Sequence, residues 1–100
     1  MYLGFKIAVV YSDPSFRDKW FNDFFKYTDK SLINIVKKSN DTIQEVVMKD
    51  GTRIVAFDLN GHKKLRAVDR VYISKDDYEI KEFETIVKAA MTSNIFIELH

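Results

Sequence analysis

Runs of hydrophobic residues, separated by turn residues, predict the order of elements along this chain. A nearly continuous apolar run from Phe5 to Tyr11 predicts a strand buried on both faces of a sheet. Asp13 and Pro14 then form a typical helix start, an N-cap followed by proline in the first turn. The aromatic stripe that follows has helical spacing and comprises Phe16, Trp20, Phe21, Phe24, Phe25 and Tyr27. It predicts an amphipathic helix of about 14 residues that ends near residues 28–29.

Three strands are expected in the middle of the chain. The segments rich in β-branched residues are Ser31 to Lys38, Thr42 to Met48 and Arg53 to Leu59. Residues 39–41 form a turn cluster between the first two strands. Asp50-Gly51 favours a two-residue hairpin between the second and third, in which both central residues take positive φ. Asn60-Gly61 marks a further turn.

The last third of the chain is predicted to contain two strands and one helix. Val71 to Ile73 is a short apolar strand, Tyr78 to Thr92 an amphipathic helix and Ile95 to Ile97 a final strand. The resulting order is β-α-β-β-β-β-α-β, an α/β or α+β fold with a single mixed β-sheet packed by two amphipathic helices. We expect the strands at 5–11, 71–73 and 95–97 to be parallel. A ferredoxin-like arrangement is the main alternative.

Composition narrows the class of protein further. The 100 residues suffice for a single domain, 1–100, and contain 46 % hydrophobic residues but no cysteine. Disulfides, cysteine nucleophiles and cysteine-bound metals are thereby excluded. The N-terminal run lacks a basic flank and a cleavage site, and no apolar stretch reaches the roughly 18 residues of a membrane span. We therefore expect a cytoplasmic protein with no membrane partner. The abundance of lysine, isoleucine and asparagine is typical of a low-GC bacterium or its phage.

The motifs of common enzymes are not found in this sequence. Its two histidines, His62 and His100, stand in no catalytic pattern, and no phosphate-binding glycine loop occurs. Glu79 and Glu82 could share a helix face and hold a magnesium ion, but interleaved lysines favour a solvated surface. We therefore predict no catalytic residues, no metal and no cofactor.

The net charge of +1 conceals two oppositely charged segments. The basic patch, with a local charge of +3 over residues 60–70, comprises His62, Lys63, Lys64, Arg66 and Arg70. The acidic patch, with a local charge of −3 over residues 75–84, comprises Asp76, Asp77, Glu79, Glu82 and Glu84. Both patches could simply solvate the surface, or they could bind a partner. Four tyrosines are further candidates for a contact surface: Tyr2, Tyr27, Tyr72 and Tyr78.

Residues 33–74 resemble the P-loop ATPase core of phage terminase large subunits. The matching pieces are Lys49-Asp50-Gly51-Thr52-Arg53-Ile54, Lys64-Leu65-Arg66-Ala67-Val68-Asp69 and Arg70-Val71-Tyr72-Ile73. In that family a hairpin precedes a basic loop and an apolar strand that ends in an acidic pair. Here the acidic pair is displaced and interrupted, since the strand is followed by Ser74-Lys75-Asp76-Asp77, and the phosphate loop is missing. The resemblance implies a phage protein rather than an ATPase.

These observations predict a small non-enzymatic interaction protein, encoded by a phage, that binds and modulates a host or phage macromolecule. A component of bacterial defence, inhibited by this chain, is one such target. The expected partner is a protein that contacts the two charged patches. The alternative is a nucleic-acid-binding accessory protein that uses the basic 62–70 loop. An enzyme with a metal site at Asp76, Asp77 and Glu79 is a third hypothesis.

Overall fold

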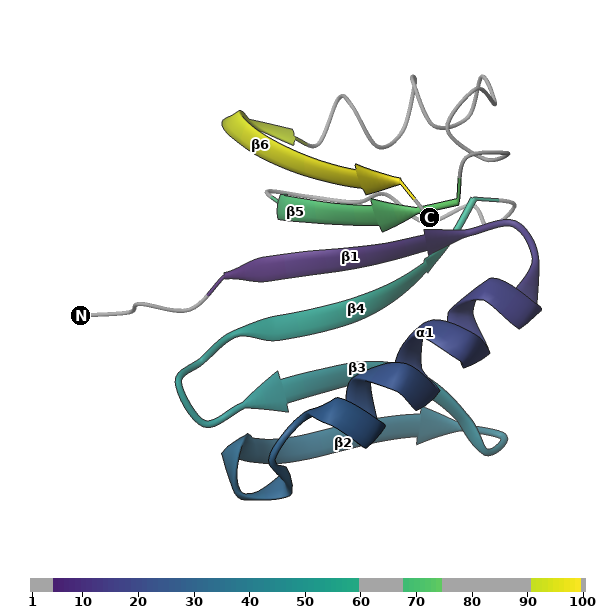
Figure 1. The fold of residues 1–100 in the computed structure, drawn as a ribbon, viewed down its shortest axis with the longest axis vertical. Coiled ribbons are helices and arrows are strands. Elements are labelled where there is room, and N and C mark those ends of the chain that lie inside the picture. The colour runs from purple at the N-terminus through teal and green to yellow at the C-terminus, as the bar shows by residue number, and fades with distance from the viewer. Residues whose placement is uncertain (1–4, 60–67, 75–90, 100) are drawn as a thin grey trace.

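The computed structural model describes residues 5–59, 68–74 and 91–99. Within these ranges the chain forms an α+β fold, a mixed six-stranded sheet with one helix, α1 (Pro14–Tyr27), against one face (Figure 1). The strands are β1 (Lys6–Tyr11), β2 (Ile33–Ser39), β3 (Thr42–Met48), β4 (Arg53–Asp58), β5 (Val68–Ile73) and β6 (Met91–Leu99). Their order across the sheet is β2-β3-β4-β1-β5-β6. The prediction of a single mixed sheet is confirmed.

The first strand lies inside the sheet, as its continuous apolar sequence predicts. β1 pairs in parallel with β4 on one side and with β5 on the other. Ala8, Val9 and Val10 are completely buried, so both faces of the strand are covered. A strand in this position has neither an edge nor a face in water, which accounts for its lack of polar alternation.

Parallel pairing extends further than the sequence predicts. β5 pairs in parallel with both β1 and β6, as expected, and β4 is also parallel to β1. β3 runs antiparallel to its neighbours β2 and β4. The second predicted helix falls mainly on residues 78–90, which lie outside the described residues. Its expected end at Thr92 is wrong, because β6 begins at Met91, where long-range pairing with Val68 decides the local structure.

Helix α1 begins and ends where its sequence predicts. The Asp13 carboxylate accepts a hydrogen bond of 2.9 Å from the backbone N–H of Ser15, and Pro14 occupies the first turn. The helix spans 14 residues and Thr28 is its C-cap. A short 3₁₀ turn, η1 (Lys30–Leu32), then leads into β2.

The two-residue turn occurs in the other hairpin from the one in which the sequence predicts it. Asn40 and Asp41, between β2 and β3, both have positive φ, at 51° and 61°. This is the two-residue geometry that we expected at Asp50-Gly51. In the β3–β4 hairpin Gly51 alone has positive φ, 94°, and its N–H donates to the Met48 carbonyl. The expected two-residue turn is therefore wrong: the Asp50 carboxylate instead accepts from the N–H of Thr52, and the loop is longer.

The helix and the sheet meet at one hydrophobic cluster. Phe21 is only 2 % exposed and packs with Val9 of β1, Val46 of β3 and Ile54 of β4. Half-buried side chains surround this cluster, among them Phe16, Trp20, Phe24 and Phe25 of α1. Phe21 is therefore the member of the aromatic stripe that is buried in the core, while the other rings stay partly accessible to solvent.

Candidate functional site

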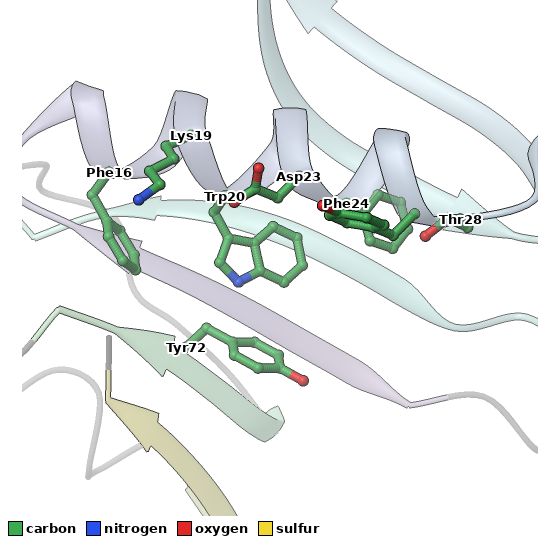
Figure 2. A pocket seen from close by; sticks show the side chains of 8 residues that line it. Phe16, Lys19, Trp20, Asp23, Phe24, Thr28 and Tyr72 are labelled. Carbon is green, nitrogen blue, oxygen red and sulfur yellow. The ribbon is translucent and has the colours of Figure 1, made fainter.

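An aromatic groove runs between α1 and β5. Its cavity volume is about 700 Å³. The described residues that line it are Phe16, Lys19, Trp20, Asp23, Phe24, Tyr27, Thr28 and Tyr72. Five of these eight side chains are aromatic. Figure 2 shows the Trp20 indole pointing from the helix toward Tyr72 on β5. We refer to these eight residues as the aromatic groove.

Helical spacing places most of the groove on one stripe of α1. Residues three or four positions apart share a helix face, so Phe16, Trp20 and Phe24 follow one another along the groove. The Trp20 and Phe24 rings stack with centroids 5.6 Å apart. Tyr72 completes the opposite wall, with its ring centroid 5.1 Å from that of Trp20. β5 supplies this tyrosine because β5 is the sheet neighbour of β1 on the side away from β4.

The described residues of the groove offer mainly aromatic surface. Among the described residues, its charged groups are one lysine, Lys19, and one carboxylate, Asp23. Among the described residues no group of three or more histidine, cysteine, aspartate or glutamate side chains is placed to hold a metal ion. The rings present flat apolar surfaces, and the hydroxyl group of the exposed Tyr27 adds hydrogen-bonding capacity. Such a surface accommodates an apolar or aromatic group.

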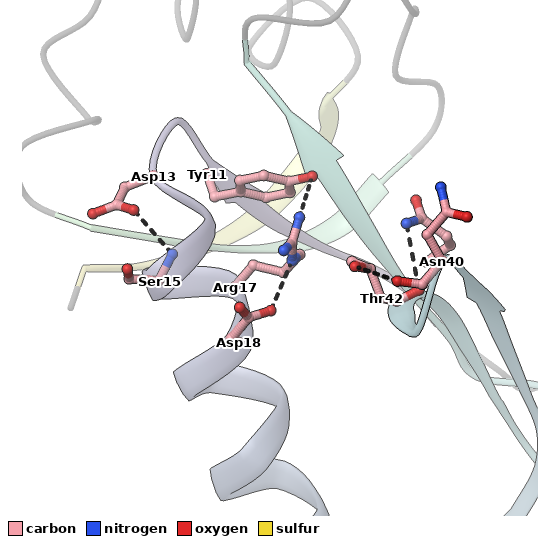
Figure 3. Close-up of polar contacts among 8 residues, drawn as sticks. Tyr11, Asp13, Ser15, Arg17, Asp18, Asn40 and Thr42 are labelled. Atoms are coloured by element: carbon pink, nitrogen blue, oxygen red, sulfur yellow. Dashed lines mark hydrogen bonds and ion pairs between the residues drawn. The ribbon is translucent and has the colours of Figure 1, made fainter.

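Polar contacts fix the N-terminal end of α1 to the end of β1. Arg17 donates hydrogen bonds of 3.1 Å to the Tyr11 hydroxyl and to the Asp18 carboxylate (Figure 3). Burial of the Arg17 guanidinium would lower its pKa, but these two hydrogen bonds outweigh burial and raise the pKa above its ordinary value. Asp13 already caps the nearby helix start, so its negative charge opposes an anion there. These contacts hold the helix that forms one wall of the groove.

A second charged cluster stabilises the sheet between β2, β3 and β4. The Glu45 carboxylate accepts a hydrogen bond of 2.7 Å from Arg53 Nη2 and lies 3.3 Å from Lys37 Nζ. Burial acts to raise the pKa of Glu45, but hydrogen bonds and charge from Arg53 and Lys37 lower it below its ordinary value. The three residues come from three adjacent strands, so we assign this cluster a structural role.

Most of the predicted site residues lie outside the described part of the chain. These are His62, Lys63, Lys64 and Arg66 of the basic patch and all five members of the acidic patch. Arg70 is described, but it belongs to β5 rather than to a loop. Its guanidinium carbon lies 5.8 Å from the centroid of the Phe5 ring. The strand begins at Val68, three residues earlier than expected, because pairing with β1 and β6 extends it.

The sequence singles out two members of the aromatic groove as candidates for a contact surface. Tyr27 and Tyr72 are predicted contact residues, and both line the groove. Tyr27 is 78 % exposed. The helical spacing of Phe16, Trp20 and Phe24 indicates core residues, and they do pack against the core cluster, but each is only half-buried and also lines the groove. The sequence carries no local signal that separates the fully buried ring from the half-buried ones, because all of them lie at helical spacing on the same stripe.

Comparison with known proteins gives no relative. No protein-family model, no curated protein and no solved structure matches this chain. Within the described residues no helix has both the length and the apolar character to cross a membrane.

Proposed function

We propose that this chain is a non-enzymatic interaction protein whose aromatic groove binds an apolar or aromatic side chain of a protein partner. The observation that carries the proposal is the aromatic cluster along a groove of about 700 Å³, in which Trp20 stacks on Phe24 and makes a tilted contact with Tyr72. Tryptophan and tyrosine are the residue types most enriched where protein interfaces concentrate their binding energy. A groove of this kind gains free energy when a partner's side chain displaces water from the rings.

The wider biological setting is part of the same proposal. The similarity of residues 33–74 to terminase large subunits and the lysine-rich composition support a phage origin. In this proposal the chain acts in the bacterial cytoplasm by occupying a surface on a larger macromolecule. We therefore propose that the partner is a host or phage protein, such as a component of bacterial defence, whose activity this chain modulates or inhibits.

The proposal is tested by affinity capture from bacterial lysate with substitutions at the groove. Tyr27→Ala and Tyr72→Ala remove one ring from each wall, and Leu32→Ala is the matched control because Leu32 is exposed but lies outside the groove. We expect a stoichiometric protein partner for the original chain and for Leu32→Ala. Each tyrosine substitution should weaken binding about 30-fold if it removes a residue that dominates the interface.

The only tryptophan of the chain reports occupancy directly. Because Trp20 lies in the groove, binding of the captured partner should shift the fluorescence emission of Trp20 as water leaves the indole. Equal capture by all variants, or an unchanged emission spectrum on binding, would contradict the assignment of the groove. A captured species that disappears on nuclease treatment would instead support the basic 62–70 segment as a nucleic-acid contact.

A further inference from the structure

One side of the edge strand β2 has no strand partner among the described residues and lies next to exposed apolar side chains. β2 is the terminal strand of the sheet order, and β3 is its strand partner within the described residues (Figure 1). Ile35 is 45 % exposed and Val36 is 38 % exposed. An edge of this kind can accept hydrogen bonds from, and donate them to, an added strand.

A second groove follows this edge, on the other flank of α1 from the aromatic groove. It lies between α1 and β2 and has a volume of about 520 Å³. The described residues that line it are Asn22, Phe25, Lys30, Ile33, Val36, Lys38 and Ile43. Four of them are apolar, two are lysines and none is acidic. We refer to these seven residues as the edge groove.

The lysines of β2 differ in their surroundings. Lys37 points to the face away from α1, where its Nζ lies 3.3 Å from the Glu45 carboxylate. Lys38 is the next residue, but it lines the edge groove on the α1 side, as does the exposed Lys30. No ion pair involves Lys30 or Lys38 within the described residues. The edge groove therefore carries two positive charges whose natural complement is a carboxylate on a partner.

We propose that β2 and the edge groove bind an extended acidic peptide segment of a partner protein by β-strand addition. The peptide backbone pairs with the open side of β2, and an apolar side chain enters the groove at Phe25 and Val36. Side chains two positions apart lie on the same face of a strand, so acidic residues two positions before and after the apolar one reach toward Lys30 and Lys38. The site is independent of the aromatic groove.

Charge disfavours a second copy of this chain as the occupant. Pairing of two β2 edges would bring Lys37 and Lys38 of both copies into one small region, and like charges across strands are destabilising. The register shift at Asn34 also interrupts a long regular pairing. Lysines and bulges on edge strands prevent identical edges from associating. A short acidic strand avoids both obstacles.

The proposal is tested with a fluorescein-labelled peptide that contains one phenylalanine with an aspartate two positions away on each side. Binding is measured by fluorescence anisotropy at low and at high salt. We expect saturable binding that weakens as salt screens the lysine–aspartate pairs. Two control peptides should fail to bind: one with lysine in place of each aspartate, and one whose backbone nitrogens are methylated on one edge to block strand pairing.

Neighbouring lysines supply a matched pair of variants. Lys38→Ala and Lys30→Ala should each weaken peptide binding about two- to five-fold, the range of an exposed ion pair. Lys37→Ala removes the same charge one residue away, on the opposite face, and should leave binding unchanged. Tyr72→Ala should also have no effect, so a failure of this proposal is distinguishable from a failure of the aromatic groove. Circular dichroism confirms that each variant is folded.

Four results would overturn the proposal. One is the absence of saturable peptide binding. The second is equal weakening by Lys37→Ala and Lys38→Ala, which would indicate general attraction to a positive surface. A third is equal binding of the methylated peptide, because strand addition requires its backbone N–H groups. A concentration-dependent dimer, seen by sedimentation and removed by Val36→Glu, would assign the edge to a second copy of the chain.

Discussion

Phe21 joins the single described helix to three strands of the sheet. Its side chain is 2 % exposed and contacts the cluster of Val9, Val46 and Ile54. Replacement by alanine leaves a cavity that the surrounding strands fill only in part. We expect Phe21→Ala to lower the free energy of unfolding by about 3–5 kcal/mol. Equilibrium denaturation in guanidinium chloride measures this loss.

Tyr27 provides the control for Phe21, because it belongs to the same aromatic stripe but is 78 % exposed. Tyr27→Ala should change the free energy of unfolding by no more than about 0.5 kcal/mol. If both substitutions had the same effect, α1 would not be held to the sheet through Phe21. The comparison also separates stability from binding, since Tyr27 lines the aromatic groove.

The β3–β4 hairpin depends on the conformation of one glycine. Gly51 has φ of 94°, where a side chain collides with the backbone, so Gly51→Ala should lower the free energy of unfolding by about 1–2 kcal/mol. Asn40 also has positive φ, 51°, and Asn40→Gly should cost nothing by the same argument. Thermal unfolding of both variants tests this. A neutral Gly51→Ala would show that the turn can relax to another geometry.

The elements themselves follow closely from local sequence. Asp13 and Pro14 define the start of α1, and residues 42–48 form β3 as expected. These successes share a cause: caps and apolar periodicity act within a few residues. The two-residue turn shows the limit of such local patterns, because it forms at Asn40-Asp41 and not at Asp50-Gly51. Strand register and loop length decide which residues take positive φ, and a dipeptide such as Asp50-Gly51 only permits it.

The candidate sites depend on contacts that no local pattern contains. Trp20 and Tyr72 lie far apart in sequence and meet only because β5 pairs with β1. The edge groove likewise requires β2 to be the last strand in the order, next to α1. Sheet order is set by the sum of many long-range contacts, and β-propensity does not encode it. Net charge and residue types therefore predict a binding protein without locating its surfaces.

Acid should destabilise the whole molecule through carboxylates whose pKa values folding lowers. Hydrogen bonds from backbone and side-chain groups lower the pKa of Asp29 and of Asp50 below the ordinary value of 3.8. The pKa of Glu45 lies below its ordinary value of 4.5 because hydrogen bonds and positive charge from Arg53 and Lys37 outweigh the effect of burial. A carboxylate whose pKa is lower in the folded than in the unfolded state stabilises the fold. This stabilisation is fully present when the pH is above the unfolded-state pKa, and it is lost as the pH falls through the folded-state pKa.

The free energy of unfolding should therefore stay level from neutral pH to about pH 5 and decline steadily below it, as urea denaturation at successive pH values would record. Glu45→Gln removes one of the titrating groups, so its stability should be lower at neutral pH and fall less steeply in acid. At low pH the two proteins should converge, because a protonated Glu45 resembles the amide. A Glu45→Gln profile parallel to that of the original chain would mean that the cluster of Glu45, Arg53 and Lys37 does not contribute to the acid sensitivity of the fold.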